Sequence, residues 1–285
     1  MAGIGSPGIK RTAGPSKGRM AVLLLLLLLT GSFTEVYAAE HPVERGETAL
    51  QIAIDHDLTM DQLSRLNPDT DLEMMRVGDV LIVPDEGMSF DEFLDWLYSE
   101  VLRFTEPVCG TAADHHAVCL FHAENISEAP LYDVQMHIRV RAANGSRAEA
   151  SGSIPLIQVM PGESLPVFID VPGAFDEISE ASVKCTGLTR SGVFSSSFRV
   201  PDSMYSVDTA MLPGHIGSTV TLRFSAEVLN SYETKKINIL AASYSAEGAL
   251  NGIRSMYSDI YPVIELTVYS SGSDVDSVRV WVEAY

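Results

Sequence analysis

The chain has 285 residues, 46% of them hydrophobic, which is too apolar for a disordered protein and is enough for two or three small domains. It carries 19 Lys and Arg against 38 Asp and Glu, a net charge of -19, so it lacks the positive field that gathers nucleic acid or anionic lipid. Its three cysteines, none in a CxxC spacing, exclude a disulfide-built miniprotein and a zinc ribbon, so a hydrophobic core must hold the fold.

The N-terminus carries the pattern of an export signal. Basic residues precede an apolar run from Met20 to Leu29, and Val36-Tyr37-Ala38 supplies small residues at the usual cleavage spacing. Because the run is about half as long as a membrane-spanning helix, we expect a cleaved signal peptide over residues 1–38 and no stable membrane insertion afterwards. A retained anchor is the alternative. The predicted location is secreted, in the cell wall or at the cell surface.

Residues 39–84 predict a small α+β unit with the order strand, helix, helix, strand. An extended piece precedes a turn at Gly46, and two capping-box signatures follow, in which a Thr and the Gln three residues later cap each other's backbone N–H groups. Val80–Val83, bounded by a turn and by Pro84, is typical of the closing strand. The two capping boxes are Thr48 with Gln51 and Thr59 with Gln62.

Helical spacing also predicts the buried face of each helix. In the first helix, Leu50, Ala53 and Ile54 form one apolar stripe. In the second helix, Leu63 and Leu66 form the stripe, and Asn67-Pro68 ends the helix.

This order of elements, with its turn, cap and helix-stop residues, resembles the LysM family. The resemblance implies binding of glycans that contain N-acetylglucosamine, such as peptidoglycan or chitin, in a shallow groove between the loops 46–48 and 68–72. The segment departs from the family at His41, where an aromatic residue is usual, and its acidic excess would weaken binding to an anionic wall polymer. The residues that carry the match are Val43, Gly46-Glu47-Thr48, Ile52-Ala53, Leu63, Leu66-Asn67-Pro68, Val77-Gly78-Asp79-Val80-Leu81 and Val83-Pro84.

The groove that the resemblance implies is chemically suited to a neutral sugar. An N-acetyl group presents one amide donor, one acceptor and a methyl, which loop backbone groups beside a small apolar floor can bind. Gly46 would let the backbone approach the sugar closely, and the polar side chains would accept hydrogen bonds from its hydroxyls. The alternative is that these residues serve only as turn and cap residues. The candidate glycan-binding residues are Gly46, Glu47, Thr48, Pro68, Asp69, Thr70, Asp71 and Leu72.

An amphipathic linker helix is predicted within residues 85–106. Ser89 and Glu92 form a third capping box, and apolar residues follow at helical spacing to Phe104. The polar face is acidic, the wrong sign for anionic headgroups, so we expect the helix to pack on a neighbouring domain rather than on a membrane. Trp96, off the main stripe, would serve either a sugar surface or the core.

Two β modules are predicted, at residues 107–200 and 201–285. Short runs rich in Val, Ile, Phe and Tyr, broken by Gly, Pro, Asn and Ser, are typical of β-sandwiches. The pattern repeats, since Pro166–Val171 parallels Pro262–Thr267. The modules resemble the immunoglobulin-like (Ig-like) or FxLYD-like domains of bacterial surface proteins, a resemblance that names no activity. The predicted fold class is multidomain, a small α+β domain followed by two all-β sandwiches.

The odd number of cysteines leaves at least one thiol outside an intramolecular bridge. Cys109 and Cys119 are the favoured pair, because turn-forming residues lie between them and an exported chain meets oxidising conditions. A Cys119–Cys185 bridge and a fully reduced chain are the alternatives. Cys185 also fits an inward-facing position as a buried thiol.

No catalytic, metal or cofactor site is predicted. Cys119 lies in a strand pattern rather than at a helix start, and the adjacent His115 and His116 point apart in most backbones. Beyond the predicted signal peptide, the chain has neither a GxSxG elbow nor a phosphate loop.

The predicted function is that of an exported, non-catalytic protein that attaches to peptidoglycan or another N-acetylglucosamine glycan, with the β modules as a spacer or interaction arm. One alternative is a surface interaction or adhesion protein, whose β modules bind a protein partner and whose LysM domain serves only as anchor. A divergent wall hydrolase is the other. Nucleic acid is not an expected partner.

Overall fold

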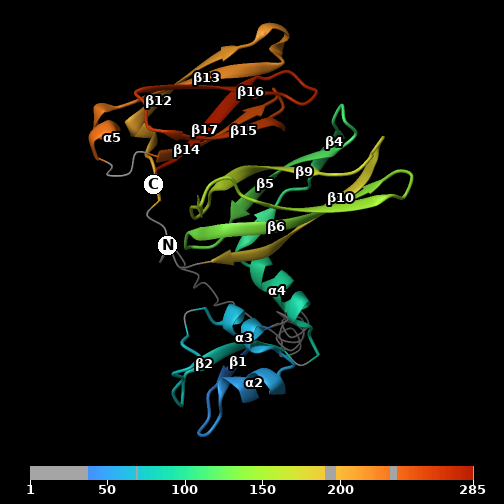
Figure 1. Ribbon diagram of the computed structural model, residues 1–285, viewed down its shortest axis with the longest axis vertical. Helices are drawn as coiled ribbons and strands as arrows, with labels where there is room; N and C mark the ends of the chain where they lie inside the picture. Colours follow the sequence, from blue (N-terminus) through green and yellow to red (C-terminus); the bar gives the residue numbers. More distant parts are fainter. Residues whose placement is uncertain (1–37, 69, 86, 190–196, 232–235, 285) are drawn as a thin grey trace, which may run out of the picture. The chain divides into compact units, whose positions relative to one another are not determined.

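The computed structural model describes residues 38–284 (Figure 1), with gaps at 69, 86, 190–196 and 232–235. The predicted signal peptide, apart from Ala38, lies outside these residues. Within the part of the chain that is described, no helix is long and apolar enough to cross a membrane. The chain divides into two compact units, Met1–Gly87 and Met88–Tyr285.

The first unit pairs two strands antiparallel and places two short helices between them in sequence. Its core is formed by side chains of both helices and of the last strand, with Ile52, Leu63 and Leu81 fully buried. In the antiparallel register of the two strands, His41 lies opposite Leu81. The elements are β1 (Ala38–Pro42), α2 (Ala49–Asp55), α3 (Met60–Leu66) and β2 (Val80–Pro84).

The two helix starts differ in how their caps are completed. At α3, the Thr59 hydroxyl accepts from the Gln62 N–H and the Gln62 side chain accepts from the Thr59 N–H, a complete capping box. At α2, the Thr48 hydroxyl accepts from the Gln51 N–H, but the Gln51 amide donates instead to Asp55, one turn further along. The predicted capping box at Thr48 is therefore wrong in its second half, because an i, i+4 side-chain pair takes the Gln51 side chain.

The buried face of α2 also differs from the predicted one. Leu50 and Ile54 are 57% and 58% exposed, and the buried stripe is Ala49, Ile52 and Ala53. Both sets satisfy helical spacing, so periodicity alone could not choose between them. The buried stripe contains two alanines and one isoleucine, whereas the predicted stripe contains only one alanine.

The second unit begins with helix α4 (Phe90–Ser99), capped by the complete Ser89–Glu92 box. The helix ends earlier than predicted, because Leu102–Phe104 forms strand β3 and pairs with β5 (Ala117–Asn125). Helix α4 packs on strand β10 (Ile178–Thr189), and Lys184 Nζ lies 3.2 Å from Asp95 Oδ1. The expectation that this helix packs on protein is confirmed.

Strands predominate in the rest of the second unit, and they form a first pair of sheets. In one sheet, β5 lies between β9 on one edge and β3 and β4 on the other. In the other sheet, β6 lies between β10 and β7, and β8 also pairs with β6. The remaining strands of this pair are β4 (Val108–Thr111), β6 (Leu131–Ala142), β7 (Arg147–Ser153), β8 (Gln158–Val159) and β9 (Ser164–Val171).

A second pair of sheets repeats this strand order. The order β9-β5-β4 corresponds to β16-β13-β12, and β10-β6-β7 corresponds to β17-β14-β15. A short strand, β11, adds to β17, so the second pair begins at Phe198, before the boundary predicted at residue 201. The elements are β11 (Phe198–Arg199), η1 (Asp202–Met204), β12 (Tyr205–Met211), η2 (Pro213–His215), β13 (Gly217–Phe224), α5 (Ala226–Ser231), β14 (Lys236–Tyr244), β15 (Leu250–Asp259), β16 (Val263–Tyr269) and β17 (Ser277–Ala284).

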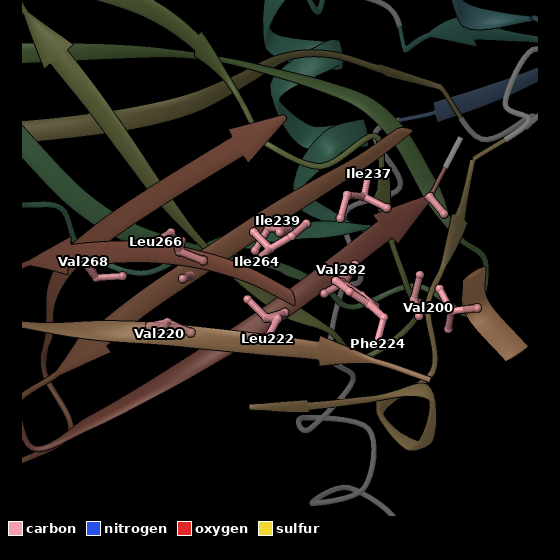
Figure 2. Packing of buried hydrophobic residues seen from close by; sticks show 13 residues of the cluster. Val200, Val220, Leu222, Phe224, Ile237, Ile239, Ile264, Leu266, Val268 and Val282 are labelled. Atoms are coloured by element: carbon pink, nitrogen blue, oxygen red, sulfur yellow. The ribbon is translucent and has the colours of Figure 1, made fainter. Parts of the chain in front are cut away.

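The core of this second pair lies between its two sheets (Figure 2). Val220 and Leu266 come from β13 and β16 of one sheet, and Ile239 and Val282 come from β14 and β17 of the other. Alternate residues of each strand point inward, as in sandwich-like β folds. The β-rich, sandwich-like part of the predicted fold class is therefore present.

Candidate glycan-binding loops

The two loops predicted to form a groove are held by hydrogen bonds to β2 or to the turn just before it. Before the first loop, the Val43 N–H donates to the Asp79 carbonyl at 2.7 Å and the Gly78 N–H donates to the Val43 carbonyl at 2.9 Å. Before the second loop, Asn67 Oδ1 accepts from the Ile82 N–H at 2.7 Å and Asn67 Nδ2 donates to the Ile82 carbonyl at 3.0 Å. Asn67 therefore pairs with the edge of β2 that β1 leaves open.

In the first loop, Gly46 has open space around it, whereas Glu47 and Thr48 form hydrogen bonds that hold the local backbone. Gly46 has φ +98°, and no atom lies within 4 Å of the position that a Cβ would take. Glu47 Oε2 accepts from the Glu44 N–H at 2.6 Å and lies 3.1 Å from His41 Nε2. These hydrogen bonds, the Glu44 N–H first and His41 second, lower the pKa of the Glu47 carboxyl. Thr48 caps α2.

The second loop is a sequence of turns. The Thr70 N–H donates to the Asn67 carbonyl at 3.1 Å, and Asp71 Oδ1 accepts from the Glu73 N–H at 3.0 Å. Asp71 therefore acts as a turn residue, which is the alternative considered from the sequence. Pro68 is exposed and Leu72 is partly buried, while Asp69 lies outside the described residues.

No hydrogen bond joins residues 46–48 to residues 68–72 in the described part of the chain. The loops are positioned separately, the first by the turn before β2 and the second by β2 itself. Each is also followed, two residues on, by an exposed apolar side chain, Leu50 at 57% and Met74 at 73%. The arrangement offers backbone groups and apolar surface together, which suits an N-acetyl group.

Sequence reasoning missed two residues that shape these loops. His41 was noted only as a departure from the family, yet it holds the Glu47 carboxylate and its ring stands edge-on to His56, with centroids 5.4 Å apart. The sequence predicts Asn67 as a helix stop and as part of the family match, but not as a partner of β2. A clue to its second task is that a buried Asn side chain must find hydrogen-bond partners.

The cysteine and histidine candidates lie in the β-rich unit. A disulfide joins Cys109 on β4 to Cys119 on β5, and Cys185 is a buried free thiol. Burial raises the pKa of Cys185 to about 12, so this thiol stays protonated and unreactive at neutral pH. His115 and His116 each lie within ion-pair distance of exposed aspartates. Among the described residues, no group of three or more His, Cys, Asp or Glu could hold a metal ion.

Comparison with known proteins identifies no family. No protein-family model and no curated protein matches the chain. A solved Northeast Structural Genomics Consortium target aligns with 10% identity and a TM-score of 0.18, over 61% of this chain and 91% of its own. The N-terminal tandem of CBM22 modules from a Paenibacillus barcinonensis protein aligns with 10% identity and a TM-score of 0.18, over 61% of this chain and 72% of its own. At these values neither likeness bears on function.

Proposed function

We propose that the chain is an exported, non-catalytic protein that attaches to N-acetylglucosamine glycans through a LysM-like domain at residues 39–84. The Ig-like or FxLYD-like β modules serve as a spacer or interaction arm. The proposal rests on the family resemblance of this segment and on one structural observation. That observation is that two exposed loops, one held to the turn before β2 and the other held to β2 through Asn67, are each followed by an exposed apolar side chain.

The charge of the segment favours a neutral glycan. Residues 41–84 contain nine acidic residues against Arg45, Arg65 and Arg76. A chitin-like polymer carries no charge to be repelled, so its binding should change little with salt. An anionic wall polymer should bind more weakly at low ionic strength, because repulsion between like charges is screened only by added salt.

The test is an NMR titration of the full chain with N-acetylglucosamine oligomers. Binding should move the amide signals of Gly46, Thr48, Thr70 and Leu72. The dissociation constant should lie roughly in the micromolar to millimolar range, because one shallow groove desolvates few sugar groups. Unchanged signals at both loops would refute the proposal.

A matched pair of variants locates the apolar floor. Leu50 and Ile54 are almost equally exposed on the same helix, but only Leu50 adjoins the first loop. Leu50→Ser should weaken oligomer binding several-fold, and Ile54→Ser should leave it unchanged. An equal effect of both variants would place the contact elsewhere. A suspension of purified wall material should not clear on incubation with the protein, as it would with a hydrolase.

A protein-binding role for the β modules is the second candidate. Tyr257, Tyr261 and Tyr269 are exposed on or beside β15 and β16, and exposed tyrosines are enriched at protein interfaces. Replacing all three with Ser in the full chain should abolish capture of a surface partner and leave glycan binding intact.

A further inference from the structure

An arginine cluster occupies the solvent-facing side of β6 and β7, in a chain whose net charge is -19. Arg139 and Arg141 alternate outward along β6, and Arg147 begins β7. The three side chains line a surface depression of about 430 Å³, together with Glu149 and Glu180 and with Ser182 of β10. The cluster therefore surrounds a concave surface.

The charges of this cluster are incompletely paired. Arg139 Nε lies 3.3 Å from Glu149 Oε2, and Arg141 Nη1 lies 3.2 Å from Glu180 Oε2. Glu149 also bonds to His137, and these hydrogen bonds, from His137 first and Arg139 second, lower its pKa and keep it ionised. Arg147 has no ion-pair partner among the described residues.

The strand register also places two of these positive charges opposite each other. Arg141 stands directly opposite Arg147 in the β6–β7 ladder, and like charges in facing positions destabilise a strand pair. The two ion pairs are well exposed, so they stabilise the sheet only weakly and leave most guanidinium N–H donors facing water. An anion placed between the facing arginines would relieve the repulsion.

We propose that this depression binds a small ligand that carries a single carboxylate or phosphate on a sugar-sized body. The planar guanidinium group of arginine can donate two parallel hydrogen bonds to either a carboxylate or a phosphate. The Ser182 hydroxyl can form a hydrogen bond with a hydroxyl group of the ligand. The volume falls within the range of small-molecule sites. The negative chain repels a polyanion strongly at long range but repels a ligand with one anionic group much less, which favours a small ligand. The inference does not depend on the loops of the first unit.

Three sugars with one shared ring test the proposal: glucose, glucuronate and glucose 6-phosphate. Each is titrated into the full chain at matched ionic strength, up to about 50 mM, roughly ten times the dissociation constant expected for so small a ligand. Glucuronate, glucose 6-phosphate or both should move the amide signals of β6 and β7 in a saturable way, while glucose should not. A response to one anion alone identifies the oxyanion. Silence with both, or an equal response to glucose, overturns the proposal.

Two variants distinguish binding in this depression from nonspecific attraction of the anion to any exposed arginine. Arg147→Gln should weaken anion binding about tenfold, since one charge-assisted contact is lost. The control is Arg223→Gln on β13, an exposed strand arginine that pairs with Asp208 outside the depression. Arg147→Gln should not lower the unfolding temperature, because it removes a like-charge pair, and Arg141→Gln gives an independent second test. Equal weakening by Arg223→Gln would overturn the proposal.

Discussion

Asn67 shows how one buried side chain can organise a small unit. Its amide donates to the Leu63 carbonyl and the Ile82 carbonyl, and its oxygen accepts from the Ile82 N–H. These bonds connect the end of α3 to the open edge of β2. One side chain therefore performs the pairing that a third strand would otherwise provide.

Replacing Asn67 with Ala should lower the free energy of unfolding of the first unit by about 2–4 kcal/mol, because the partly buried N–H and carbonyl of Ile82 lose their partners. Urea denaturation of the full chain, followed through the amide signals of α2, measures this loss. The control is Gln51→Ala, which removes an exposed side-chain hydrogen bond to Asp55 and should change stability by less than about 0.5 kcal/mol. Similar losses in the two variants would contradict the structural role of Asn67.

Glu283 is a buried carboxylate whose charge affects stability. Its oxygens accept from the N–H groups of Ile157 at 2.8 Å and Gln158 at 3.0 Å, yet desolvation outweighs these bonds and raises its pKa. Arg199 lowers this pKa and Glu163 raises it, both as smaller effects. The folded state therefore holds the proton to a higher pH than the unfolded state does, so the contribution to stability falls as pH rises above the ordinary carboxyl range.

The Glu283→Gln variant cannot ionise at this position. The difference in unfolding temperature, variant minus wild type, should therefore increase as pH rises from about 4 to 7, whatever constant offset the amide introduces. Calorimetry across this range measures the slope. A difference that stays flat or decreases would show that Glu283 ionises without penalty in the fold.

The helices show which parts of an element can be read from sequence. Their starts were predictable, because a Ser or Thr cap acts on backbone groups within three residues. The buried face of α2 was not, since two apolar stripes compete. The end of α4 was missed because Leu102 and Phe104 continue the helical spacing, and only the distant partner β5 draws them into a strand.

The candidate loops were predictable in position but not in detail. A glycine turn and an Asn-Pro helix stop mark where the loops lie. The pairing of His41 with Glu47 and of Asn67 with Ile82 depends on how the elements pack, which no local pattern encodes. Asp71 also shows that a polar loop residue can be occupied by its own turn.

The disulfide between β4 and β5 closes a short hairpin. Replacing Cys109 and Cys119 together with Ala should lower the free energy of unfolding by about 2–3 kcal/mol, as chain entropy predicts for so short a loop. Reducing agent should lower the stability of the wild type and leave that of the double variant unchanged. Peptide mapping without reduction that recovered Cys185 linked to either cysteine would contradict this pairing.

The two pairs of sheets meet through partly buried polar contacts. Arg199 of β11 donates through Nη2 to the Gln158 carbonyl at 2.7 Å and to Glu163 Oε2 at 3.0 Å, so a strand of the second pair bonds to the first. His122 and Tyr244 add a second contact, with their polar atoms 3.1 Å apart and their rings stacked. The sequence repeat predicts two similar modules, but these contacts join residues too far apart in the chain for a repeat to reveal.

We expect the two pairs of sheets to unfold in one calorimetric transition. Arg199→Met should lower stability by about 2–3 kcal/mol, because it leaves the partly buried Glu163 without its cation, and should separate the transition into two. Arg103→Met, which removes an exposed pair with Glu124, is the control and should preserve the single transition. Two transitions in the wild type, in addition to that of the first unit, would contradict this coupling.

The Cys109–Cys119 bridge also has a mechanical consequence. Tension applied from the N-terminal side enters the second unit through α4 and reaches β3, which only three residue pairs hold on β5. A peeling force would detach β3 and then Val108, and there it would meet a covalent bond that anchors the chain to Cys119, near the start of β5. The bridge therefore acts as a stop that limits how far the chain can be drawn out while the sandwich keeps its core, and reduction removes this stop.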